Sequence, residues 1–97
     1  MSQQSIEALK KANHVRSERN RIKREIKAGT VTVRDVLEAD PYVCAAMSIS
    51  ELLTSQTRWG PFRVSRLLAW YPPHPISENR EIRDLSPRQK QYIIDAT

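Results

Sequence analysis

The residues best suited to bind a ligand lie in one short segment around a glycine and a proline. Gly60 can adopt a positive φ, and Pro61 suits the first position of a helix, where its missing N–H is not needed. The turn therefore offers unpaired backbone N–H groups at the positive end of a helix. Arg58, Arg63 and Arg66 lie within reach of it. This arrangement is typical of a phosphate-binding site and indicates a nucleic-acid ligand.

The other reactive side chains form no recognisable catalytic or metal-binding set. Cys44 is the only cysteine, and His14 and His74 lie far apart in the sequence. No nucleophile with a base, no pair of carboxylates and no metal-ligand spacing stands out. We therefore expect a protein that is not an enzyme and has neither metal nor cofactor, with Cys44 as a small buried side chain.

The positive charge is concentrated in two blocks. The chain has a net charge of +5 and a pI near 9.8, which favours a polyanionic partner. Residues 7–28 carry eight basic residues against three acidic ones, and residues 57–70 carry three arginines and no acid. The intervening residues 29–56 are acidic. The alternative is that each block is simply a solvated helix face. If the blocks bind DNA, the candidate contacts outside the turn are Arg16, Arg19, Lys23, Lys27, Arg80 and Arg83.

Residues 5–28 are predicted to form one long helix, which Gly29 ends. Its apolar stripe is interrupted by Arg19 and is strong only from Val15 onward. The first half of the helix is therefore expected to project from the domain, either as a DNA-binding arm or as a loose end. This pattern predicts an N-terminal basic helical arm, residues 1–28, and a compact helical domain, residues 29–97.

Capping signals divide the second part into short helices, so the fold class is all-α. The helices are predicted to start near Val33, at Ser48, at Pro61, near Ser77 and at Ser86. The third helix should end near Gln56 and the fourth near Trp70. Trp59 has two interpretations: it packs the turn onto the core, or it is exposed as a wedge between bases. Tyr92, Ile93 and Ala96 are expected to dock the last helix.

No apolar run approaches the ~20 residues of a membrane helix, and the first residues lack the pattern of a signal peptide. We therefore expect a cytoplasmic protein without a membrane partner. Because Cys44 is the only cysteine, no internal disulfide is possible, which fits a reducing cytoplasm.

The order of these motifs resembles the actinobacterial-type integration host factor family, including the versions encoded by actinobacterial phages. The resemblance covers about residues 6–97. Gly60 and Arg63 match the family's turn pattern of glycine-x-glycine-lysine-x-arginine. Residues Arg80, Arg83, Leu85, Arg88 and Gln89 match the arginine-rich stretch and the start of the last helix.

The resemblance implies a helix-two-turns-helix core, similar to a helix-hairpin-helix, and sequence-tolerant binding and bending of double-stranded DNA. A role in nucleoid organisation or phage recombination is also implied. We expect the protein to be a monomer. The chain departs from the family pattern at four positions, which are Arg58, Pro61, Glu81 and Asp84. Two other functions remain open: a structured-RNA or ribosome binder, and a phage protein that inhibits a host protein or nucleoid factor.

Overall fold

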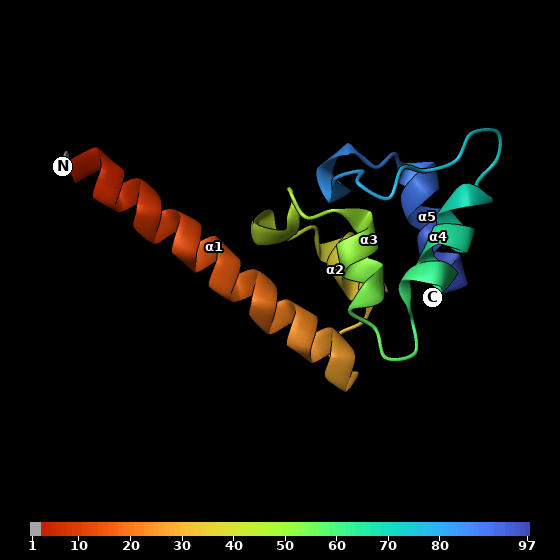
Figure 1. The fold of residues 1–97 in the computed structure, drawn as a ribbon, viewed down its shortest axis with the longest axis horizontal. Helices are drawn as coiled ribbons and strands as arrows, with labels where there is room; N and C mark the ends of the chain where they lie inside the picture. Colours follow the sequence, from red (N-terminus) through yellow and green to blue (C-terminus); the bar gives the residue numbers. More distant parts are fainter. Residues whose placement is uncertain (1–2) are drawn as a thin grey trace.

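The longest element is α1 (Gln3–Ala28), which runs unbroken for 26 residues and projects away from the other helices (Figure 1). Its second half packs closely against them, where Ile22 and Ile26 are buried, and the first half contacts the body where Lys11 lies over the ring of Tyr42 and a shallow hollow forms there. The projecting half explains the radius of gyration of 14.7 Å, since a compact chain of this length has about 12.5 Å. Gly29 follows α1 with φ 85, as its position predicted.

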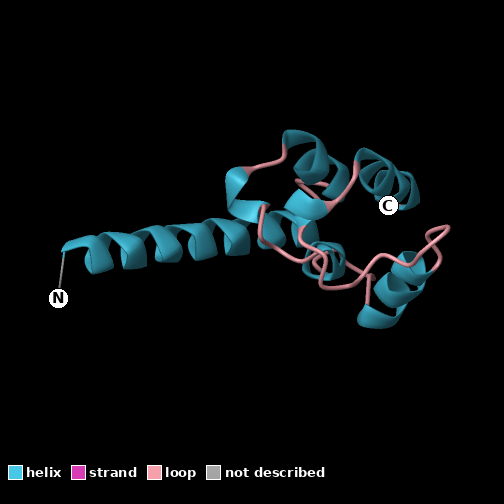
Figure 2. Ribbon diagram, turned by 90° about the horizontal axis from the view of Figure 1, so that it is seen from above, coloured by secondary structure: helices cyan, strands magenta, loops and turns pink. Residues whose placement is uncertain are grey.

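The computed structural model describes the backbone of residues 3–97 and the side chains from residue 6 onward. Short helices and loops make up the body, and the described residues contain no strand (Figure 2). The all-α expectation is therefore confirmed. After α1 the elements are α2 (Val33–Ala39), the 3-10 helix η1 (Tyr42–Cys44), α3 (Ile49–Thr54), α4 (Pro61–Ala69), the 3-10 helix η2 (Ile82–Asp84) and α5 (Pro87–Ala96).

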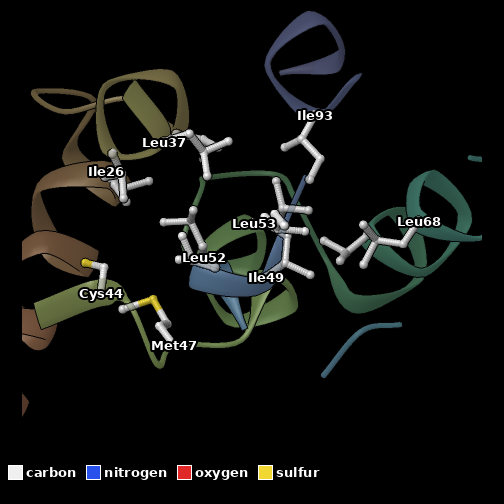
Figure 3. Close-up of a cluster of buried hydrophobic side chains, with 14 of the residues drawn as sticks. Ile26, Leu37, Cys44, Met47, Ile49, Leu52, Leu53, Leu68 and Ile93 are labelled. Atoms are coloured by element: carbon white, nitrogen blue, oxygen red, sulfur yellow. The ribbon is translucent and has the colours of Figure 1, made fainter. Parts of the chain in front are cut away.

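The helix α3 lies at the centre of the core. Its Ile49, Leu52 and Leu53 are fully buried. Figure 3 shows Leu37 and Ile93 approaching these side chains from neighbouring helices. Burial of each such side chain contributes about 1.5–3 kcal/mol, so the core, rather than helix propensity, holds these short helices in place.

Because Ile22 and Ile26 belong to the same buried cluster, the second half of α1 is part of the packed body. The division into residues 1–28 and 29–97 stays a prediction. Within residues 3–97, no helix has the length and apolar character that crossing a membrane requires.

Two of the predicted capping boxes form in full. Thr32 and Asp35 exchange hydrogen bonds at the start of α2, and Ser86 and Gln89 do the same at the start of α5. Both helices therefore start where the local sequence predicted. The reason is that each capping box satisfies N–H groups that the helix itself leaves unpaired.

Four other expectations about helix ends and helix docking need correction. Ser48 caps α3, but the carboxylate of Glu51 pairs with Lys23 instead of completing a capping box. Ser77 caps no helix, because its hydroxyl bonds the nearby N–H of Asn79 and η2 begins later. The helix α3 ends at Thr54 rather than Gln56, and Ala96 is exposed at the end of α5.

Candidate nucleic-acid interface

The turn between α3 and α4 carries the predicted anion-binding residues, but its backbone differs from the expectation. Gly60 is the N-cap of α4 with φ −76, so it does not use the positive φ that is open to glycine, and a Cβ at Gly60 would meet no atom within 4 Å. Arg58 adopts the left-handed conformation instead, with φ 72. The turn therefore reverses two residues earlier than expected, at a residue with a Cβ. This conformation costs a non-glycine residue about 1 kcal/mol.

Pro61 occupies the first turn of α4, as predicted. No hydrogen bond among the described residues uses the backbone N–H groups of Phe62 and Arg63. These two groups point out of the helix N-terminus, where its dipole favours an anion.

Trp59 joins the turn to the body. Its ring is partly buried against the core, which confirms the first of the two interpretations. The guanidinium of Arg63 lies 4.0 Å from the centre of the ring. This cation–π contact holds Arg63 beside the turn.

A groove of about 570 Å³ lies between the second half of α1 and the segment that follows α3. Lys23, Arg24 and Lys27 line it from α1, and Arg58 lines it from the turn. The remaining lining residues are Asn20 and residues 54–57, all uncharged and polar. We call this hollow the basic groove. Its lining contains four cations and no carboxylate, which suits a phosphate backbone.

The α3–α4 turn is fixed to α1 beside this groove. Thr57 donates a hydrogen bond of 2.8 Å from its hydroxyl to the carbonyl oxygen of Lys27. This bond joins residues that lie far apart in the sequence, so the cations from α1 and from the turn keep a common orientation. Figure 1 shows the end of α1 and the α3–α4 turn at the same side of the body.

The cations of the basic groove are not equally available. Lys23 forms an ion pair with Glu51, with 2.7 Å between Nζ and Oε1. Arg24, Lys27 and Arg58 take part in no ion pair among the side chains of residues 6–97. These three residues keep their full charge for an external anion.

Two of the predicted contacts lie farther along α1. Arg16 and Arg19 line a separate hollow with Tyr42. Arg19 is partly buried, and its Nε donates a hydrogen bond of 2.6 Å to the carbonyl oxygen of Val43. Arg19 therefore attaches α1 to η1, while Arg16 is exposed.

The predicted arginines of α4 lie outside the basic groove. Arg63 is stacked on Trp59, as described above. The guanidinium of Arg66 lies 5.9 Å from the ring of Phe62 and 5.7 Å from that of Trp70. Both arginines are exposed, so their charge reaches solvent around the start and the outer face of α4.

The structure does not bring Arg80 and Arg83 to the basic groove. Arg80 donates two hydrogen bonds to the carbonyl oxygen of Asp84. Nε of Arg83 lies 2.6 Å from Oε2 of Glu81, without the alignment of a hydrogen bond. The segment with η2 lies at the top of the view in Figure 1, and the α3–α4 turn lies at the bottom.

Sequence reasoning missed two residues of the basic groove, Arg24 and Asn20. Their positions in the sequence could have identified them, because Asn20 lies three residues before Lys23 and Arg24 lies three residues before Lys27. Residues three or four positions apart share one face of a helix. A search for cations around Lys27 at this spacing selects Arg24.

The described residues contain no group of three or more His, Cys, Asp or Glu side chains that could hold a metal ion. Cys44 is fully buried, as expected, and burial raises the pKa of its thiol. A buried thiol with a raised pKa is a poor nucleophile.

No protein-family model and no curated protein matches the chain. A solved structure of sIHF bound to an 8-base-pair palindromic DNA does match it. The match has a TM-score of 0.80 at 26% sequence identity and covers 90% of this chain and 97% of the sIHF chain. The chain therefore has a fold like that of an integration host factor. The actinobacterial type and the phage origin stay predictions.

Proposed function

We propose that this protein binds double-stranded DNA through the phosphate backbone and acts as an architectural protein rather than an enzyme. The basic groove is the observation that carries the proposal, because it brings four cations together without a carboxylate. The similarity to sIHF supports it, since that protein was solved with DNA.

The contacts follow from the positions of the charges. Arg24, Lys27 and Arg58 hold one stretch of phosphates in the basic groove. The N–H groups of Phe62 and Arg63 bind a further phosphate at the start of α4, where the helix dipole assists. Arg63 and Arg66 neutralise phosphates nearby. Arg16, at the middle of α1, and the projecting half before it extend the contact along the duplex.

The binding is tolerant of sequence, because these residues meet phosphates and not base edges. Contacts on two sides of the turn favour a bent duplex. On the same basis we propose a role at the nucleoid, either in its organisation or in phage recombination, and a monomer as the binding unit.

A salt series with short duplexes of random sequence tests this proposal. If roughly 6–8 phosphates are neutralised, the plot of log affinity against log salt concentration has a slope of about −5 to −7. The R63A/R66A variant should bind more weakly and reduce the slope by about 2. Unchanged affinity of this variant would exclude the side chains of Arg63 and Arg66 as phosphate contacts.

Competition identifies the nucleic acid. Duplex DNA should displace a labelled duplex at lower concentration than an RNA stem-loop of equal length at the same salt concentration. If the RNA competes better, the protein is an RNA binder. Light scattering of the complex gives the number of protein chains on each duplex.

A further inference from the structure

Two large aromatic side chains remain uncovered on α4. Phe62 is 75% exposed and Trp70 is 72% exposed. They lie on the face opposite Val64 and Leu68, which are buried in the core. The guanidinium of Arg66 lies between them, within 6 Å of each ring. We call Phe62, Arg66 and Trp70 the α4 stripe.

The sequence segment that contains the α4 stripe has no acidic residue. Residues 52–77 contain no aspartate and no glutamate. Both tryptophans and the only phenylalanine of the chain lie within residues 59–70 of this segment. Exposed rings that alternate with arginine, in a segment without acidic residues, suit a partner that presents flat rings and negative charge together.

A second copy of this chain does not fit the α4 stripe. In a two-fold symmetric contact between two stripes, parallel or antiparallel, Arg66 of one copy meets Arg66 of the other. Bringing two like charges together at the centre of a contact is unfavourable. The charge therefore favours an anionic partner.

We propose that the α4 stripe binds unpaired nucleotides of DNA, with bases stacked on Phe62 and Trp70 and a phosphate held by Arg66. This proposal rests on the proposed DNA binding and extends it from duplex to unpaired strands. The stripe begins at the turn whose Arg58 lines the basic groove, so a strand that leaves a duplex in that groove meets Phe62 first.

The distance between the two rings of the α4 stripe determines how many unpaired nucleotides can lie along it. Phe62 and Trp70 are eight residues apart, which corresponds to about 12 Å along a helix. Stacked bases are about 3.4 Å apart along one strand, so the two rings span three to four base steps. The expected ligand is therefore a duplex with an unpaired stretch of about four nucleotides.

The experiment compares an intact duplex with the same duplex carrying a gap of about four nucleotides in one strand. Fluorescence anisotropy with the full chain should give about 30-fold tighter binding to the gapped duplex, as expected for two base–aromatic stacks at the weak end of their range. The F62A/W70A variant should lose this preference and keep its affinity for the intact duplex. The proposal is wrong if this variant keeps the preference, or if the unaltered protein has none.

The matched control is L9A, which removes another exposed apolar side chain, on the projecting half of α1. It should keep the preference for the gapped duplex. W70F retains a ring and should also keep it. Because all these side chains are exposed, circular dichroism should show the same helical content in every variant.

Tryptophan fluorescence gives a second measurement. In a W59F variant, Trp70 is the only tryptophan, and an oligothymidylate should quench its emission. An absence of quenching would contradict stacking on Trp70. If polyglutamate of equal length displaces the gapped duplex as well as the oligothymidylate does, the stripe binds acidic protein, and the proposal is overturned.

These measurements separate the two proposals. If the unaltered protein does not bind the intact duplex, the proposed function is rejected. Quenching of Trp70 by the oligothymidylate tests the α4 stripe alone. An R24Q/K27Q variant should weaken binding to intact and gapped duplexes by the same factor and leave their ratio unchanged.

Discussion

The basic groove and the segment around η2 both contain arginines, but these arginines differ in their bonding partners within the protein. In the groove, Arg24, Lys27 and Arg58 form no ion pair among the described side chains. In the η2 segment, Arg80 bonds the carbonyl oxygen of Asp84, and Arg83 lies against Glu81. The arginines of the two regions therefore differ in how far their guanidinium groups are already bound within the protein.

The difference arises from what the backbone places beside each cation. The η2 segment is fixed to the start of α3 by backbone hydrogen bonds, among them Ile82 N to Met47 O at 3.0 Å. This attachment holds the carboxylate of Glu81 next to Arg83 and the carbonyl oxygen of Asp84 next to Arg80. The basic groove instead joins a helix face and a turn that carry no acid. Net charge alone does not identify a binding surface, because local partners decide which charges remain.

The largest expected effect comes from removing the groove cations together. The R24Q/K27Q/R58Q variant should lose duplex affinity on the order of 100-fold and reduce the salt slope by about 3, because each contact contributes about 0.9 to it. Anisotropy titrations across a salt series measure both quantities.

The matched control is R80Q/R83Q, which removes two charges from the η2 segment. Its affinity should change less than threefold. If this double variant loses as much affinity as the groove variant, the two regions are equivalent in binding and the comparison fails.

A smaller effect is expected at Arg58, where charge and backbone strain coincide. R58G should lower duplex affinity about fivefold, because one phosphate contact is lost. Its free energy of unfolding should rise by up to ~1 kcal/mol, because glycine adopts φ 72 without strain. Chemical denaturation and DNA titration of the same sample separate the two effects.

R58A keeps the strained backbone and removes only the charge. It should bind as weakly as R58G without the gain in stability. A loss of stability in both variants would mean that the Arg58 side chain supports the fold.

The ion pair between Lys23 and Glu51 allows a variant with increased duplex affinity. E51Q releases Lys23 into the basic groove and should raise duplex affinity two- to threefold, with a salt slope steeper by up to about 1. E38Q is the control, because Glu38 pairs with Arg34 on α2, and Arg34 does not line the groove. Equal gains in both variants would indicate only the general change in net charge.

The smallest effect concerns stability in acid. Hydrogen bonds from the backbone and side chain of Thr32 lower the pKa of Asp35 below its ordinary value of 3.8. Its contribution to stability is therefore present above pH 3.8 and is lost as the pH falls through the lowered pKa. D35N should be less stable than the unaltered protein at neutral pH, and thermal denaturation should show this difference shrinking below pH 3.8.

Local sequence predicted the helix starts well, because each depends on a few adjacent residues. Thr32, Pro61 and Ser86 each satisfy or remove an unpaired N–H group at a helix start, whatever the rest of the chain does. Ser48 also caps α3 as predicted, but its incomplete capping box and the missing helix start at Ser77 have a tertiary cause. Glu51 pairs with a lysine from α1, and the backbone of residues 78–83 pairs with the start of α3.

The candidate site was predicted in part. The sequence indicated Lys23, Lys27 and Arg58 as separate candidates, and only the packing of α1 against the α3–α4 turn placed them in one groove with Arg24. The resemblance indicated a glycine position at residue 58, and the structure keeps the left-handed backbone there with an arginine. The replacement of a glycine by Arg58 therefore does not by itself show whether the left-handed backbone is kept at this position.

The sequence by itself determined the helical class, the capped helix starts and a positive charge in two blocks, because these depend on neighbouring residues and composition. Only the tertiary structure decided which cations remain unpaired, where the groove lies and which aromatic side chains stay uncovered. Those properties depend on contacts between residues distant in the sequence, such as Thr57 with Lys27 and Lys23 with Glu51. Such contacts form only after the core has fixed the helices in place.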